Sequence, residues 1–367
     1  MKWVWQDNKW PNFTYSHPEL DDKEAIFNQN IGIVIGAMNH LAESNHSVAT
    51  IDILTQEAVS TSNIEGEILR RDSVQSSIRK HMGLKIDRRN VDANEAGMAE
   101  LMVNLYYLYR NPLDKEMLCD WNHMVCNGRR DLDVIGDYRK HAEPMQVVGG
   151  SFNKPKVFYE APPSSQLDHE MEKYISWYNR ALSDRKNLPN LAFAGMAHLY
   201  FEMIHPFEDG NGRIGRALVE KSISQRINRP ALNSFAKVID QNKKEYYNAL
   251  KACNHHLDIS SWLHYFTDTI IASQEYTINL IKFIIDKSKF FTKHKDINQR
   301  QEKVLVRVFE EGMEGFKGGL SANNYQTIAQ TSPATATRDL QELVNMGALA
   351  KSGELKSTRY WLNLQHL

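Results

Sequence analysis

The chain has 367 residues, of which 42% are hydrophobic and 24% charged, and its formal net charge is −1. This composition is typical of a soluble globular protein, and the length allows about two or three domains. The near-zero charge excludes a polycation that coats nucleic acid. Three scattered cysteines exclude a disulfide framework. The sequence shows neither a signal peptide nor an apolar membrane span, so we expect a cytoplasmic protein without a membrane partner.

The first half of the chain begins with an aromatic extension and continues as helices. Residues 1–20 contain Trp3 and Trp5 in alternation, which predicts a short strand or an extended arm packed on a core. Residues 21–110 form an N-terminal helical region, with apolar side chains at helical spacing. A further helical pattern over 112–130 opens a second region, which we place at 111–290.

One β-hairpin interrupts the region 111–290. Gly149-Gly150 and residues 153–155 have turn chemistry, while Val147, Val148 and residues 157–159 favour strands. Helices are predicted over 166–182 and 191–204, and then from the end of the segment 205–216 to about residue 289. A polar junction near 293–296 ends the region.

The carboxy-terminal region, 297–367, is predicted to be a winged helix-turn-helix domain. Residues 325–330 and 334–346 have helical patterns, and Thr331-Ser332-Pro333 between them supplies an N-cap and a helix-starting proline. Gly347 ends the second helix. Residues 349–350 and 360–362 flank a segment typical of a hairpin wing. The predicted fold class is therefore mainly α, with a helical bundle, a β-hairpin and a winged helix-turn-helix domain.

The segment HPFEDGNGRIGR, residues 205–216, carries the strongest chemical signal. Gly210, Asn211 and Gly212 stand at the start of a helix, where backbone N–H groups and the helix dipole bind anions. Arg213 and Arg216 lie on one side of this helix, and guanidinium groups suit phosphate oxygens. The pattern indicates a polyphosphate site. It is not a Walker loop, since no Gly-Lys-Ser/Thr follows.

The same segment supplies a metal ligand and a base. Asp209, beside the phosphates, is the expected ligand of Mg²⁺. Glu208 is the alternative ligand, and we interpret it as a solvated neighbour. His205 ends the preceding helix and can deprotonate an incoming hydroxyl. Together these residues predict phosphoryl or nucleotidyl transfer.

The segment fits H-x-F-x-D/E-G-N-G-R-x-x-R at every defined position, so the sequence resembles Fic-domain protein adenylyltransferases over roughly residues 50–290. The resemblance implies a Fic-type bundle that transfers AMP from ATP to a Ser, Thr or Tyr hydroxyl of a target protein and of itself. It implies that His205 is the base, that Phe207 anchors the loop and that Asp209 holds Mg²⁺. The ATP-binding residues that it implies are Glu65, His205, Gly210, Asn211, Gly212, Arg213, Ile214, Gly215, Arg216, Asn242, Tyr246 and Tyr247.

The resemblance leaves some of these assignments open. Relatives that phosphorylate depart from the second glycine of G-N-G, so Gly212 favours AMP transfer, whereas UMP and phosphocholine transfer stay open. The hairpin 147–159 corresponds to the family's flap, which holds a target segment by strand addition. Tyr246 and Tyr247 are candidates for a nucleotide-base wall with Asn242, although paired helical tyrosines are equally typical of a core.

A second segment, STSNIEGEI, carries Thr61, Glu65 and Gly66 with the spacing of the family's inhibitory signature S/T-x-x-x-E-G/N. We place it on an inhibitory helix at about 50–70. The resemblance implies that Glu65 pairs with Arg216 and repels the triphosphate. The alternative is a surface carboxylate, and Glu67 beside it is interpreted as part of a solvated charged face. In some relatives the same glutamate supports removal of AMP, so a deAMPylase is an alternative activity.

Two other function classes compete with the enzyme. The winged helix could make the chain a nucleotide-sensing DNA-binding regulator, with Thr335, Thr337 and Arg338 near a groove. However, residues 321–361 hold four Lys/Arg and three Asp/Glu, a weak footprint for phosphate binding. The third class is a toxin that is released from its brake. Family members often modify themselves and often dimerise, so the resemblance implies both.

Overall fold

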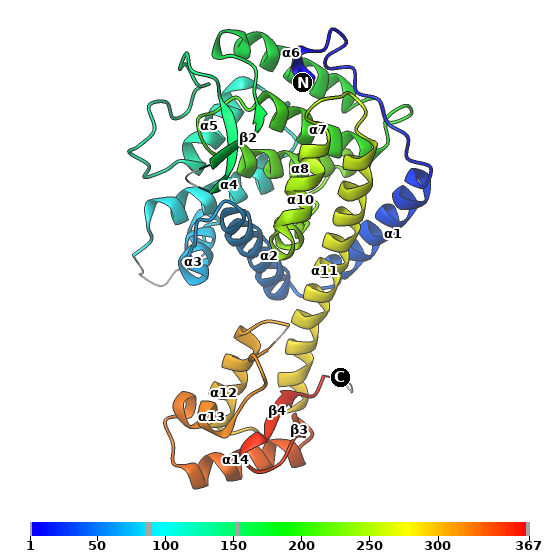
Figure 1. The fold of residues 1–367 in the computed structure, drawn as a ribbon. Coiled ribbons are helices and arrows are strands. Elements are labelled where there is room, and N and C mark those ends of the chain that lie inside the picture. The colour runs from blue at the N-terminus through cyan, green and yellow to red at the C-terminus, as the bar shows by residue number, and fades with distance from the viewer. Residues whose placement is uncertain (1, 85–89, 152–153, 314, 365–367) are drawn as a thin grey trace. The chain divides into compact units, whose positions relative to one another are not determined.

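The computed structural model describes residues 2–84, 90–151, 154–313 and 315–364, and the chain divides into two compact units (Figure 1). The first unit comprises Met1–Gly36 and His46–Ile278, and the second comprises Ala37–Asn45 and Asn279–Leu367. Helices account for most of the described residues, so the structure confirms the mainly α fold class. Within the described residues, no helix is both long and apolar enough to cross a bilayer.

The first unit holds the segment 205–216 and the elements around it. In chain order these are η1 (Val4–Gln6), α1 (Leu20–Asn39), α2 (Glu43–Ile64), α3 (Arg71–His81), α4 (Ala93–Leu108), α5 (Lys115–Val125), β1 (Gln146–Ser151), β2 (Lys154–Glu160), η2 (Ser164–Gln166), α6 (Leu167–Ala181), α7 (Asn190–Ile204), α8 (Asn211–Ile227), α9 (Phe235–Gln241), α10 (Lys243–Ala252) and α11 (Ser260–Lys293). Helices α1 and α11 begin in this unit and continue into the second.

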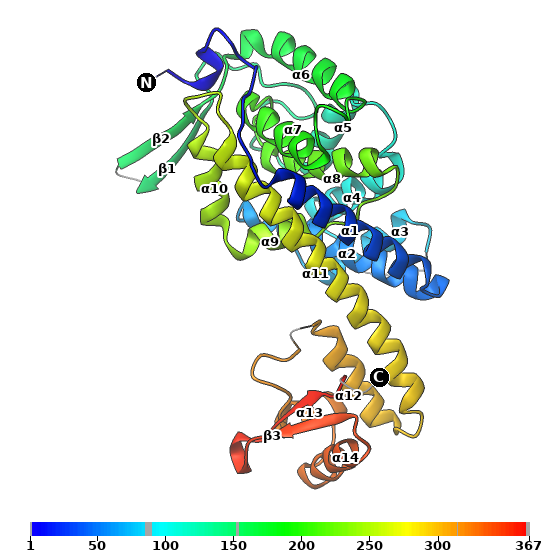
Figure 2. The ribbon, with the colours of Figure 1, turned by 90° about the vertical axis from the view of Figure 1, so that its right-hand side faces the viewer.

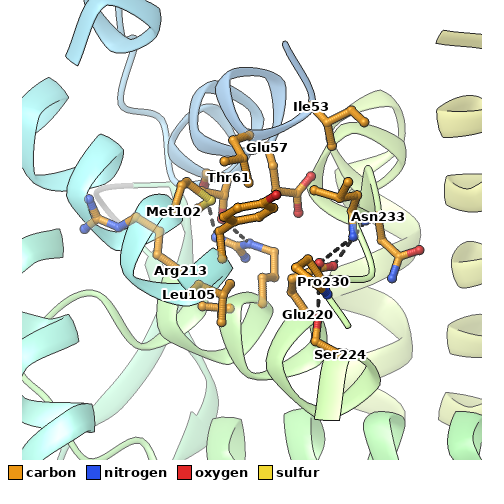
Figure 3. A pocket seen from close by; sticks show the side chains of 15 residues that line it. Ile53, Glu57, Thr61, Met102, Leu105, Arg213, Glu220, Ser224, Pro230 and Asn233 are labelled. Atoms are coloured by element: carbon orange, nitrogen blue, oxygen red, sulfur yellow. Dashed lines mark hydrogen bonds between the residues drawn. The ribbon is translucent and has the colours of Figure 1, made fainter. Parts of the chain in front are cut away.

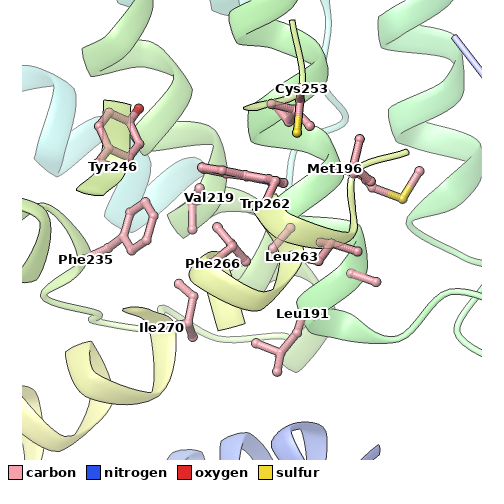
Figure 4. Close-up of a cluster of buried hydrophobic side chains, with 14 of the residues drawn as sticks. Leu191, Met196, Val219, Phe235, Tyr246, Cys253, Trp262, Leu263, Phe266 and Ile270 are labelled. Carbon is pink, nitrogen blue, oxygen red and sulfur yellow. The ribbon is translucent and has the colours of Figure 1, made fainter. Parts of the chain in front are cut away.

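Helix α7 lies at the centre of the first unit because its sequence is apolar on nearly every face. It packs closely against α8, and the side chains of α9, α10 and α11 close the core around them (Figure 4). Trp262 of α11 is fully buried, and its indole N–H donates to the carbonyl of Gly195 on α7 (2.8 Å). A helix that is apolar all round is buried all round, so α7 and the residue that ends it have a fixed position.

The aromatic extension is an arm rather than a strand. Over the described residues 2–19 the chain forms the single turn η1 and an isolated bridge between Thr14 and Asp258, and the rings of Trp3, Trp5, Trp10 and Phe13 pack on the main core. Figure 2 shows η1 beside the hairpin formed by β1 and β2. The predicted hairpin is confirmed, with antiparallel pairs from Gln146–Glu160 to Ser151–Lys154.

The second unit has its own core. Its elements after α11 are α12 (Gln299–Glu310), α13 (Ala322–Ala329), α14 (Pro333–Asn345), β3 (Leu349–Ser352), η3 (Leu355–Ser357) and β4 (Arg359–Leu362). The turn chemistry at Ser332 is confirmed, since its hydroxyl caps the N–H of Thr335 and Pro333 is the first residue of α14. Gly347 follows α14 with a φ of 71°, and β3 pairs with β4. Helix α12 was not predicted from the sequence.

The close contact between α7 and α11 predicts how a methyl group added at Gly195 changes the free energy of unfolding. A Cβ at Gly195 would lie 2.8 Å from Leu263 and 2.9 Å from Phe266, so we expect Gly195→Ala to lower the free energy of unfolding by about 1–3 kcal/mol. Gly32 on α1 is the matched control, because a Cβ there meets nothing within 4 Å; Gly32→Ala should raise that free energy by up to about 1 kcal/mol. Urea unfolding followed by tryptophan fluorescence measures both, and equal effects would contradict the packing described.

Candidate active site

The loop between α7 and α8 has a conformation that its own residues fix. His205 ends α7 in the left-handed region, with φ 51° and ψ 60°. Phe207 is fully buried against Tyr138 and Phe201. The side chain of Asn211 bonds both the N–H (3.0 Å) and the carbonyl (2.8 Å) of Phe207. Asn211 therefore closes the loop on itself, and its amide faces the loop backbone.

A buried arginine that sequence analysis missed holds the backbone of His205. Arg139 is 1% exposed, and its Nε donates to the carbonyl of His205 (2.9 Å). Its Nη2 donates to the carbonyl of Pro162 (2.6 Å), and its Nη1 donates to the hydroxyl of Ser164 (3.0 Å). Pro162 and Ser164 follow the hairpin, so one guanidinium joins the root of the hairpin to the His205 loop. Arg139 stands in the sequence GDYR just before the hairpin, and nothing in that pattern signals a distant partner.

The side chain of His205 is held as a neutral base. Its Nδ1 lies 3.3 Å from the carbonyl of Glu202, and a carbonyl only accepts, so Nδ1 carries the proton and Nε2 keeps a free lone pair. Burial and the positive charge of Arg139 lower the pKa of His205 to about 4. A neutral imidazole at pH 7 with a free Nε2 can accept a proton from a hydroxyl.

Both arginines of the segment are buried and both are paired with carboxylates. Arg216 is 2% exposed; its Nη2 donates to Glu65 (2.6 Å) and its Nε to the hydroxyl of Thr61 (2.7 Å). Arg213 is 4% exposed and donates to Glu67 (2.7 Å). The structure thus brings Thr61, Glu65 and Arg216 together. The interpretation of Glu67 as part of a solvated face is wrong, because Arg213 needs a partner where water is excluded.

Two glycines of α8 leave room for carboxylates. A Cβ at Gly212 would lie 2.3 Å from Oε1 of Glu65, and a Cβ at Gly215 would lie 2.2 Å from Oε1 of Glu202. Gly66, directly after Glu65, has a φ of 84°, which lets the chain turn away from the end of α2. Burial raises the pKa of Glu202 to about 8, although Arg216 opposes this. The missing side chain of Gly212 therefore leaves the space in which Glu65 reaches Arg216.

Asp209 lies between two guanidinium groups. Arg129 donates to one of its oxygens and Arg213 to the other, the latter at 3.3 Å. Burial alone would raise the pKa of Asp209, but Arg213 and Arg129 hold it below its usual range. In the described part of the chain, no group of three His, Cys, Asp or Glu side chains forms a metal site. Asp209 could therefore give Mg²⁺ one hard ligand, a carboxylate oxygen, and the other ligands would be phosphate oxygens and water molecules.

The remaining candidates occupy different environments. Glu208 accepts the N–H groups of Asp133 (2.9 Å) and Val134 (3.3 Å), so it holds a loop while it stays partly exposed to solvent. Tyr246 is 1% exposed and its hydroxyl lies 2.8 Å from Nε2 of His198, which places it in the core. Tyr247 is 44% exposed. Asn242 is exposed between α9 and α10, and Ile214 is buried on α8.

A small cavity lies behind Thr61, between α2, α4 and α8 (Figure 3). Its volume of about 20 Å³ suits a single water molecule rather than a ligand. Glu57 beside it accepts the N–H of Ala236 (2.8 Å), and Glu220 accepts the N–H of Leu232 (2.7 Å). Glu57 of α2 thus binds the first turn of α9, and Glu220 of α8 binds the segment that leads to α9.

The comparisons with known proteins agree with this geometry. Residues 112–222 match the profile of the Fic/DOC family, and residues 3–84 match a domain of unknown function, DUF4172. The chain contains a Fic/DOC domain.

Two curated relatives carry the name protein adenylyltransferase Fic. The one from Nematostella vectensis is 30% identical over 129 residues, and the one from Drosophila grimshawi is 26% identical over 207 residues. The matches cover 34% and 55% of this chain but only 28% and 37% of those proteins.

Solved structures share the fold. A Fic family protein from Desulfovibrio desulfuricans aligns over 96% of this chain and 98% of its own, with a TM-score of 0.54 and 18% identity. Fic-1 from C. elegans aligns over 72% of this chain and 74% of its own, with a TM-score of 0.52 and 19% identity.

The environment of His205 predicts its titration. Because a lowered pKa means that the charged form is disfavoured, we expect His205 to stay neutral from pH 7 down to about pH 4. Histidine NMR signals followed against pH measure this, with the His205→Ala variant identifying the resonance. A midpoint at or above the ordinary value of about 6.5 would contradict the buried, arginine-flanked setting.

Proposed function

We propose that this protein is a protein adenylyltransferase, which transfers AMP from ATP to a Ser, Thr or Tyr hydroxyl of a target protein and of itself. The observation that carries the proposal is the neutral His205, fixed directly before a helix N-terminus that presents two arginines. Base and anion site are thereby adjacent on one rigid loop. The names of the curated relatives support the same activity and imply ATP as substrate.

The proposed chemistry follows from these positions. Backbone N–H groups at the start of α8 and the guanidinium of Arg213 bind the phosphates, and Arg216 binds the γ-phosphate. Nε2 of His205 takes the proton as the hydroxyl oxygen of the target attacks the α-phosphorus. The bond between the α-phosphorus and the bridging oxygen breaks, and pyrophosphate leaves. Tyr247 and Asn242, which are exposed, are the candidates for contacts to the base; Tyr246 supports them from the core.

Asp209 is the residue that would hold Mg²⁺ brought by the triphosphate, and the ion would neutralise phosphate charge there. Arg129 and Arg213 both donate to the Asp209 carboxylate, so both of its oxygens have partners before any nucleotide binds. A bare cation would have to displace these guanidinium groups, whereas phosphates that arrive with the cation can take over the released donors. The proposal therefore expects metal and nucleotide to bind together.

We propose that the segment 61–67 is a brake. Glu65 occupies Nη2 of Arg216, a donor that a γ-phosphate needs, and Glu67 occupies Nη1 of Arg213. Their negative charges also repel a triphosphate. Removal of AMP by the same site, and transfer of UMP or phosphocholine, are the alternative activities. The flap β1–β2 is the proposed docking site of the target, and dimerisation stays a prediction.

Release of the brake gives the first functional test. We expect Glu65→Gly to raise label transfer from α-phosphate-labelled ATP by roughly 10- to 100-fold, which corresponds to about 1.4–2.8 kcal/mol of barrier. Addition of His205→Ala should abolish the gain, because no base remains. Self-labelling measured on gels checks both.

Glu100→Gly is the matched control, since Glu100 is an exposed carboxylate on α4 and its loss should leave labelling unchanged. Normal ATP binding by Glu65→Gly without any gain in labelling would refute the brake. Labelling that survives His205→Ala would refute the proposed base.

For the second unit we propose a winged helix that docks protein. Its order of three helices and a hairpin is typical of that module. Several of its basic side chains are already paired: Arg300 with Asp339 (3.1 Å), Arg307 with Glu311, and Arg338 with Glu342 (3.9 Å). Such pairing reduces the positive charge that these three arginines offer to phosphates and disfavours the DNA-binding regulator.

This weak cationic surface predicts weak DNA binding. For the full chain and a random DNA duplex, we expect the logarithm of the affinity to fall with the logarithm of salt concentration at a slope no steeper than about −2, which corresponds to about two phosphate contacts. Fluorescence anisotropy at several salt concentrations measures the slope. A slope of about −5 or steeper would support the regulator instead.

A further inference from the structure

The amino-terminal arm, residues 2–15, contacts the flap where β2 ends. The indole N–H of Trp5 donates to the carbonyl of Glu160 (2.7 Å), and the ring of Trp3 meets Tyr159 edge-on at 5.6 Å. Trp3 also stacks on His255 at 4.8 Å, in the loop that follows α10. Figure 2 shows η1 next to the root of the hairpin. The arm therefore lies between the flap and the end of α10.

These contacts fall on one edge of the flap. The N–H of Ala161 donates to the carbonyl of Met145, so the backbone groups of this residue pair face the neighbouring strand. In an antiparallel ladder the N–H and C=O groups of the next residue pair face outward. Glu160, opposite Gln146, therefore presents its carbonyl to the outside of β2. Trp5 binds this outward carbonyl.

A second outward carbonyl on β2 is also covered. The register slips at Phe158, which has no partner residue on β1, and its carbonyl accepts the side-chain N–H of Asn254 (2.8 Å). The carbonyl of Asn254 in turn accepts the N–H of Val4 (2.8 Å). Trp5, Val4 and Asn254 together close the outer edge of β2 at the flap root.

The outer edge of β1, unlike that of β2, is not covered by the described residues of the arm. Within the described residues this sheet has two strands, so both are edge strands, and the contacts of the arm with the flap fall on β2. Val148 is 58% exposed and Val147 39% exposed, on a strand whose outward N–H groups are available to a further strand. An isolated hairpin is marginally stable in water, so its position depends on what holds its root.

We propose that the arm positions the flap: it closes the edge of β2, fixes the flap root against the end of α10, and leaves β1 as the edge to which an extended, apolar target segment is added. This proposal rests on the proposed function of the flap as the target-docking site. It gives the first residues of the DUF4172 match a role in target selection. Small displacements of a docked hydroxyl reduce transfer strongly, so an anchored flap root favours productive docking.

The anchor is tested first without reference to activity. Trp5→Phe keeps a ring but removes the donor to Glu160. We expect backbone amides of residues 145–161 to exchange hydrogen for deuterium about two- to tenfold faster in the full-length variant, with α7 and α8 unchanged. Unchanged exchange in the flap would overturn the arm as its anchor.

The open edge is tested with two proline variants in the Glu65→Gly background. Gln146→Pro removes the outward N–H of β1 and Glu160→Pro the outward N–H of β2, and both lose the same side-chain hydrogen bond between Gln146 and Glu160. The acceptor is the His205→Ala chain, labelled in trans. We expect Gln146→Pro to raise the KM for the acceptor about two- to tenfold more than Glu160→Pro does, while the KM for ATP is the same in both variants.

The outcomes separate the two proposals. Equal loss in both proline variants, or a loss only in Glu160→Pro, would overturn β1 as the docking edge. If the Glu65→Gly parent labels no acceptor while ATP binds, the proposed function fails, and hydrogen exchange still decides whether the arm anchors the flap.

Discussion

The burial of two arginines on one helix is the constraint on which the rest of the site depends. Arg213 and Arg216 are 4% and 2% exposed, and a buried cation without a partner is strongly destabilising. Glu67 and Glu65 supply the missing charge from a segment about 150 residues earlier. A triphosphate would supply the same charge, so under the proposed function the groups that stabilise the fold are the groups that ATP displaces. The proposed inhibition would therefore use the same ion pairs as folding.

The position of His205, the proposed base, depends on a different set of contacts. His205 has a left-handed backbone that few residues other than glycine adopt, and Arg139 satisfies the carbonyl that this conformation turns inward. The same guanidinium binds the segment that leaves the flap, so the flap root and the base share one buried anchor. Burial is the larger cause of the lowered pKa of His205, and the positive charge of Arg139 adds to it. Arg139 therefore affects both the position and the protonation of the imidazole.

Sequence reasoning predicted the contiguous features, and among the distant contacts it predicted the pairing of Glu65 with Arg216, which the family resemblance implied. The loop 205–210 and the start of α8 could be predicted because one segment carries their residues, and the hairpin and the cap at Ser332 follow from local turn chemistry. The pairing of Glu67 with Arg213 and the contacts of Arg139 and Arg129 could not be predicted, because a single sequence does not reveal which buried charges meet. Tyr246 is a further example. The sequence predicts that it lies on a helix, but its partner His198 is seen only in the folded structure. Helix α12 was overlooked, although its apolar residues Val304, Leu305 and Val308 have helical spacing.

The central claim is that Glu65 competes with the γ-phosphate for Arg216. The most direct measurement is calorimetric binding of ATP and ADP to the wild type and to Glu65→Gly. The account predicts that the variant gains affinity for ATP by about tenfold more than for ADP, because only ATP carries the group that replaces Glu65. An equal gain for both nucleotides, or no gain for either, would contradict the account.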